Sequence, residues 1–247
     1  MQDRSAYPRV TTVLNVVAKD TLVNWAVKEA LKKLQRLYAE RLGSSEGPLP
    51  DLKDLCDEAK GAANEIKLNA ARRGTATHHL IEGRTEEELT LQDGDLDSVR
   101  PMYESFKLWA SERNFVPIAN EVPIWSDKHG FKGTLDCIGT VDGRLELIDW
   151  KTSNHIGLDY RLQTAAYWYG LKECKPDMFY QPNGDADRLP LQGIRIVRFG
   201  GRSDKETQLK DVVTYDELII DGEDDISVDF NAFLAAKRLH DWQLKRK

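Results

Sequence analysis

The residues best suited to chemistry are two aspartates and a lysine, Asp136, Asp149 and Lys151, in the stretch GTLDCIGTVDGRLELIDWK. Two apolar runs in this stretch flank Asp142-Gly143. This dipeptide is the strongest short-range signal for a β-hairpin, because both central residues of a type I′ turn need positive φ. If the turn consists of these two residues, counting back along both arms places Asp136 directly opposite Asp149.

The predicted hairpin brings like charges together. Directly opposed residues have Cβ atoms roughly 4.5–5.5 Å apart, and two carboxylates at that separation repel each other. Lys151 lies two residues beyond Asp149, so its side chain points to the same face of the strand. We therefore expect a cation between the carboxylates, and a divalent metal ion is the natural candidate because hard cations take oxygen ligands.

Further polar residues stand in segments with a helical pattern. His78 follows Gly74 near the end of a pattern that begins at about Asp51, and Gln163 and Tyr167 are one helical turn apart. Taken singly, His78 is by default an ordinary histidine, and the other two are compatible with plain helix packing. Their functional interpretation therefore depends on the whole series of motifs.

Hydrophobic periodicity predicts the elements that position these residues. We expect an extended lead-in over 7–14, a polar loop over 176–190 and an acidic linker over 221–225. The expected helices cover residues 21–41, 51–82, 98–114, 158–173 and 228–244, and the expected strands cover 116–125, the two hairpin arms, 191–199 and 208–214. This order predicts an α/β fold in which helices flank a central mixed sheet, with a helical N-terminal part.

Composition limits the class of protein. The 247 residues are 40% hydrophobic and 31% charged, and they contain neither a long apolar run nor a secretory signal. The three cysteines are far apart, which argues against disulfides and favours a cytoplasmic protein. The net charge of −6 counts mildly against a nucleic-acid binder, but local basic patches suffice to hold phosphates.

Four motifs together resemble a nuclease family. Asp136 followed by Asp149-Trp150-Lys151 fits the PD-(D/E)xK nuclease pattern, and the preceding Gly133-Thr134-Leu135 strengthens the match. Gly74 to His78 looks like the GxxxH motif of the RecB-like branch, and Gln163 to Tyr167 looks like its QxxxY motif. The N-terminal YPRVTTVL…LVNWA resembles the lead-in of phage exonucleases and of the mitochondrial genome maintenance exonuclease.

The resemblance implies a restriction-endonuclease-like core in a single PD-(D/E)xK domain over residues 1–247, with 1–73 as a helical cap or arch. It implies a Mg²⁺- or Mn²⁺-dependent exonuclease that acts at ends of single-stranded DNA, in phage-type recombination, replication or repair, with a partner protein from such a pathway. No iron–sulfur cluster is expected, because relatives that hold one use four cysteines. The alternatives are a structure-specific or restriction-like endonuclease and a catalytically silent DNA-binding module. The oligomeric state stays open.

The resemblance also assigns roles to residues. Asp136, Asp149, the carbonyl of Trp150 and His78 would hold the metal, and the histidine nitrogen favours Mn²⁺ over Mg²⁺. Lys151 would orient the attacking water. The remaining candidates are Gln163 and Tyr167 as phosphate-contacting or supporting groups and Glu121 as a weaker participant near the site. Apart from the resemblance, the basic residues Lys28, Lys32, Arg36 and Arg73 are candidates for DNA binding, and for the helix over 21–41 a solvated basic face is the alternative.

Overall fold

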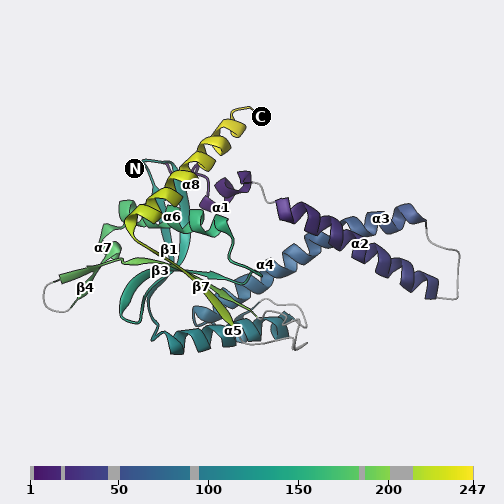
Figure 1. The fold of residues 1–247 in the computed structure, drawn as a ribbon, viewed down its shortest axis with the longest axis horizontal. Helices are drawn as coiled ribbons and strands as arrows, with labels where there is room; N and C mark the ends of the chain where they lie inside the picture. The colour runs from purple at the N-terminus through teal and green to yellow at the C-terminus, as the bar shows by residue number, and fades with distance from the viewer. Residues whose placement is uncertain are drawn as a thin grey trace. The chain divides into compact units, whose positions relative to one another are not determined.

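A computed structural model of the chain describes residues 3–17, 20–43, 51–89, 95–183, 187–200 and 214–246 (Figure 1). The chain forms two compact units. One unit comprises Met1–Val17 and Ala76–Lys247, and the other comprises Ala18–Thr75. In the described ranges, no helix combines the length and apolarity that a membrane span requires.

The larger unit is built on a mixed sheet of five strands in the order β1-β2-β3-β6-β7. Strands β3 and β6 pair in parallel, and the other neighbours pair antiparallel. The strands are β1 (Val116–Ser126), β2 (Phe131–Val141), β3 (Arg144–Lys151), β6 (Gly193–Phe199) and β7 (Tyr215–Asp221). This sheet confirms the predicted α/β fold with a central mixed sheet.

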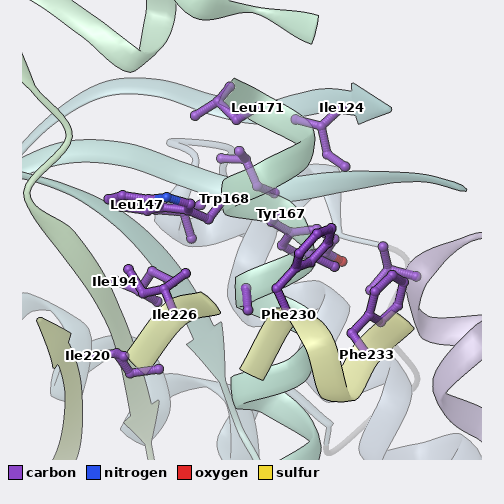
Figure 2. Close-up of a cluster of buried hydrophobic side chains, with 14 of the residues drawn as sticks. Ile124, Leu147, Tyr167, Trp168, Leu171, Ile194, Ile220, Ile226, Phe230 and Phe233 are labelled. Carbon is purple, nitrogen blue, oxygen red and sulfur yellow. The ribbon is translucent and has the colours of Figure 1, made fainter. Parts of the chain in front are cut away.

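Helices cover both faces of the sheet (Figure 1). Helices α6 (Leu158–Cys174) and α8 (Glu223–Leu244) pack on one face, where Figure 2 shows Tyr167 of α6 beside Phe230 of α8. Helix α5 (Asp95–Glu112) packs on the other face through Trp109. Both faces of β3 are therefore buried from Leu145 to Trp150, and this burial includes the carboxylates of Glu146 and Asp149.

The smaller unit is helical. Helix α2 (Asp20–Gly43) packs against α3 (Leu52–Lys60), and Lys33 on α2 forms an ion pair with Glu65 at 3.3 Å. The helix expected over 51–82 is in fact two helices, α3 and α4 (Ala62–Ile81), separated at Gly61. Gly74 lies inside α4, where its helical backbone is tolerated at modest cost.

Three other predictions were wrong in detail. The extended lead-in contains a short helix, α1 (Val10–Val13), and a 3-10 turn, η1 (Leu14–Val16), because its valines turn into the core rather than pairing in a sheet. The polar loop contains α7 (Pro176–Phe179) and a small hairpin of β4 (Tyr180–Asn183) and β5 (Asp187–Pro190). A second 3-10 turn, η2 (Glu86–Glu88), precedes α5.

The strand expected over 208–214 lies outside the described residues except for Thr214, and strand β7 begins at Tyr215. The third error concerns the acidic linker expected over 221–225, which in fact ends strand β7 and opens helix α8. Glu223, Asp224 and Asp225 form the first turn of α8, where the positive end of the helix dipole favours carboxylates.

Candidate active site

The site begins with the tight turn between β2 and β3. Asp142 and Gly143 have φ values of 50° and 81°, as a type I′ turn requires. The Asp142 amide donates to the Arg113 carbonyl at 2.8 Å, and the Asn114 amide donates to the Asp142 carboxylate at 2.8 Å. The ladder runs from Val141 opposite Arg144 to Cys137 opposite Ile148, which confirms the predicted register over five pairs.

The regular ladder ends one residue short of the predicted Asp136–Asp149 pair. Leu135 and Ile138 both pack on the α6 side of the sheet, so the alternation of faces changes between them. Asp136 lies at this change, and its carboxylate accepts a hydrogen bond from the Trp150 amide at 2.8 Å. This contact still joins β2 to β3, but it leaves the second Asp136 oxygen free to face other elements.

Glu121 on β1 lies opposite Asp136, since its neighbours Asn120 and Val122 pair with Cys137 and Leu135. Its φ of 49° is unusual for a residue other than glycine, and it marks the same local distortion. The sequence predicted Glu121 only as a weaker participant near the site, and nothing in its local pattern indicates this backbone conformation.

His78, Glu121 and Asp136 form a cluster able to hold a metal ion. One ligand atom from each lies within 4.8 Å of the others, and His78 Nδ1 is 3.9 Å from Asp136 Oδ1. Burial lowers the pKa of His78, and the Lys151 ammonium lowers it further, so a neutral imidazole is available as a ligand. One nitrogen and two carboxylates suit a divalent cation such as Mn²⁺.

Helix α4 places His78 through packing against α5. Ala76 and Leu80 are buried against Val99, and the Thr77 hydroxyl donates to the Met102 sulfur at 3.5 Å. These contacts fix the side of the helix next to His78, so the histidine faces β1 and β2.

Asp149 and Lys151 form a buried ion pair beside this cluster. Lys151 Nζ is 2.5 Å from Asp149 Oδ2, and the Asp149 side chain is fully buried. Burial raises the pKa of Asp149 to about 6, although the nearby Lys151 opposes the shift. Burial disfavours the Lys151 ammonium, but Asp149 and Asp136 outweigh that effect and raise its pKa, so Lys151 is charged at neutral pH.

Helix α6 closes the other side of this ion pair. Gln163 Nε2 donates to Tyr167 Oη at 3.0 Å and to Asp149 Oδ1 at 3.4 Å. Sequence reasoning missed Tyr160, whose ring centroid lies 4.8 Å from Lys151 Nζ. The signal was present, because Tyr160, Gln163 and Tyr167 share the spacing of one helix face.

A cavity of about 400 Å³ borders the site through Tyr167. Arg4 in its wall pairs with Asp127 at 2.6 Å and lies 4.4 Å from the Trp125 ring centroid, while Lys132 Nζ donates to the Arg4 carbonyl at 3.0 Å. The cavity is lined by Arg4, Arg9, Val10, Thr11, Pro123, Ile124, Trp125, Lys132, Gly133, Thr134 and Tyr167.

The four candidate DNA-binding residues all lie in the smaller unit. Lys28, Lys32 and Arg36 recur every four residues on α2, so they share one face, and all three are exposed. Lys32 forms an ion pair with Glu29 at 2.8 Å. Arg73 lies on α4 and is half-buried.

Comparison with known proteins gives a match to the family model of the PD-(D/E)XK nuclease superfamily over residues 29–217. Similar solved structures include a phage-related exonuclease from Haemophilus somnus 129PT, with 14% identity over 72% of this chain and 82% of that chain and a TM-score of 0.36. An alkaline exonuclease, LHK-Exo from Laribacter hongkongensis, shows 16% identity over 76% and 86%, with a TM-score of 0.30. LHK-Exo in complex with dAMP shows 18% identity over 73% and 96%, with a TM-score of 0.33. No curated protein matches the chain.

Proposed function

The chain belongs to the PD-(D/E)XK nuclease superfamily, and we propose on that basis that it is a metal-dependent DNA exonuclease of the RecB-like type. It hydrolyses phosphodiester bonds from the ends of single-stranded DNA. The observation that carries this proposal is the juxtaposition of the His78–Glu121–Asp136 cluster with the buried Asp149–Lys151 pair.

The donor set fits a divalent metal ion, which nucleases of this superfamily use. His78, Glu121 and Asp136 would hold it from one side, with Asp149 and the Trp150 carbonyl next to them. The imidazole nitrogen favours Mn²⁺ over Mg²⁺. When bound, such an ion offsets charge on the scissile phosphate and lowers the pKa of a coordinated water.

The protein residues contribute charge and orientation. The Lys151 ammonium, fixed by Asp149 at 2.5 Å, holds the attacking water and stabilises the extra negative charge of the pentavalent transition state. Gln163 and Tyr167 form a hydrogen-bonded pair on α6 that fixes the orientation of Asp149 and offers polar groups to the phosphate.

The cavity beside Tyr167 suits the neighbouring part of the DNA backbone. Arg9 is exposed at its wall, and the hydroxyls of Thr11 and Thr134 add hydrogen-bonding groups. A basic and hydroxyl-rich wall next to the reaction centre is suited to a backbone phosphate. The basic face of α2, made of Lys28, Lys32 and Arg36, with Arg73 on α4, supplies further phosphate contacts.

The test is cleavage of a 5′- or 3′-labelled single-stranded oligonucleotide in Mn²⁺. Lys151→Ala should lower the rate by about 10²-fold or more, because it removes a preorganised charge from the transition state. Lys107→Ala is the matched control, since Lys107 is half-exposed on α5 and forms an ion pair with Glu104 at 2.6 Å. Equal cleavage by wild type and Lys151→Ala contradicts the assignment.

Closed circular single strands separate the two kinds of nuclease. An exonuclease leaves them intact while it degrades the linear form. Nicking of the circles identifies the protein as an endonuclease of the same superfamily.

A further inference from the structure

Helix α8 has a second apolar face besides the one that covers the sheet. Ile226, Phe230 and Phe233 bury the first face in the core. The second face is exposed, and its members, which we call the α8 stripe, follow at intervals of four, three, four and three residues: Val228, Ala232, Ala235, Leu239 and Trp242. This spacing is the a/d heptad pattern of helices that pack lengthwise against another helix.

The large side chains of the α8 stripe are well exposed. Val228 is 67% exposed, Leu239 is 43% exposed and Trp242 is 56% exposed. Single apolar residues scattered over a surface are normal, but a continuous apolar stripe along about four helical turns indicates an interaction surface. Tryptophan is also among the residues that most often dominate the binding energy of an interface.

The two ends of α8 carry opposite charges. Asp224 and Asp225 lie exposed in its first turn. Lys245 and Arg246 directly follow its last residue and are exposed as well. Two copies of α8 that pack antiparallel bring the acidic end of each beside the basic end of the other, whereas parallel copies bring like charges together. Charge therefore favours the antiparallel arrangement.

The sizes of the side chains fit the same arrangement. Ala232 and Ala235 occupy the middle of the stripe, where small residues let two helices approach closely. A layer that pairs Ala232 of one copy with Ala235 of the second also places Val228 against Leu239. Each of these pairs occurs twice about a two-fold axis, so the contact closes as a dimer.

We propose that the α8 stripe binds the same stripe of a second copy of this chain in an antiparallel two-helix contact. The partner is a second copy because the face is complementary to itself in both charge and size. The inference is independent of the proposed function. A single helix pair lies at or below the low end of the roughly 1,200–2,000 Å² that stable interfaces bury, so we expect a dissociation constant of about 1–100 μM.

The experiment is sedimentation equilibrium of the full chain over about 1–100 μM, where the mass should rise from that of a monomer to that of a dimer. Leu239→Glu should weaken the dimer by about tenfold or more, because it buries a carboxylate in an apolar contact. Leu108→Glu is the matched control, since Leu108 on α5 is 40% exposed and lies outside the stripe. A monomer throughout this range, an assembly of more than two copies, or a dimer that Leu239→Glu leaves unchanged overturns the proposal.

Charge reversal tests why the partner is a second copy. Asp224→Lys/Asp225→Lys should weaken the dimer several-fold, and adding Lys245→Asp/Arg246→Asp should restore it. Failure of the combined variant to dimerise better than the first contradicts the charge complementarity on which the choice of partner depends.

Disulfide trapping tests the orientation. When Val228→Cys protein is mixed with Leu239→Cys protein and oxidised, mass spectrometry should find mainly the disulfide between positions 228 and 239. A majority of disulfides between like positions overturns the antiparallel arrangement. Thermal unfolding of each variant checks that it is folded, and Ala235→Glu repeats the sedimentation test at a small exposed residue if Leu239→Glu folds poorly.

Discussion

Gly133 on β2 offers a direct way to move Tyr167 without mutating it. A Cβ atom at Gly133 would lie 2.7 Å from Tyr167 Cε1 and 3.4 Å from Cδ1. The first separation is below 3.0 Å, which real Cβ contacts essentially never show. Tyr167 is only 4% exposed, so its ring cannot swing into solvent. Gly133→Ala must therefore displace the ring, either against the packed core or toward the adjoining cavity.

The displacement acts on both stability and activity. Overpacking of this kind costs about 1–3 kcal/mol of the free energy of unfolding. The Tyr167 hydroxyl accepts a hydrogen bond from Gln163 at 3.0 Å, and Gln163 also contacts Asp149 at 3.4 Å. A shift of a few tenths of an ångström or more is transmitted to Asp149, and misplacement near 1 Å costs about 10²-fold in rate. We therefore expect the cleavage rate of the folded protein to fall by about 10- to 100-fold, up to the loss that a 1 Å misplacement causes.

Gly170→Ala is the matched control, because Gly170 lies on α6, the helix that carries Tyr167. Its Cβ would lie 2.8 Å from Ile124 Cδ1 and 3.4 Å from Phe131 Cε2, which are core contacts. Overpacking should lower the free energy of unfolding of this variant too. The loss should be smaller by roughly 1 kcal/mol, because alanine is more favourable than glycine inside a helix. Urea unfolding measures both free energies, and the labelled oligonucleotide measures both rates. A wild-type rate in folded Gly133→Ala refutes the reasoning, as does an equal loss of rate in Gly170→Ala.

Three further changes have definite expected outcomes. The buried Arg195 has Glu146 as its main counter-charge, with Arg195 Nε 2.6 Å from Glu146 Oε2. Glu146→Gln removes this charge and should lower the free energy of unfolding by about 3 kcal/mol. An unchanged urea midpoint contradicts this prediction. Burial raises the pKa of Asp149 to about 6, so below that pH a proton on Asp149 competes with the metal ion. Mn²⁺ affinity should therefore fall about tenfold per pH unit below pH 6. Calorimetry that shows equal affinity at about pH 5 and pH 7 contradicts this prediction. Tyr160→Leu removes a cation–π contact with Lys151 that is worth about 0.5–2 kcal/mol, so it should slow cleavage several-fold. Tyr160→Phe keeps the aromatic ring and should keep the rate. An equal loss of rate in both variants contradicts a role for the ring.

Local signals in the sequence were sufficient for the hairpin and its register. Asp142-Gly143 specifies a turn with two positive φ values, and the turn length alone then determines which residues face each other. The helix that carries Gln163 and Tyr167 was also predictable, because a continuous helical pattern needs no knowledge of distant neighbours.

The distortion at Glu121 and Asp136 was not predictable in this way. Regular alternation is the assumption behind any prediction of which face a strand residue occupies, and here β1 and β2 both depart from it. The metal-binding cluster also joins three elements, β1, β2 and α4, and the position of His78 on α4 depends on packing against α5. No short stretch of sequence encodes such a meeting.

The two kinds of strand pairing around β3 also differ in folding cost. The β2–β3 hairpin joins neighbours in the chain, whereas the parallel β3–β6 pair forms only after the long intervening segment with α6 has been ordered. Local pairings close small loops and form early, while non-local ones are slow. Asp136 and Asp149 should therefore meet early, and His78 should join them late. Since a late-formed site stabilises the native state more than the folding transition state, we expect bound metal to slow unfolding and to leave the folding rate nearly unchanged.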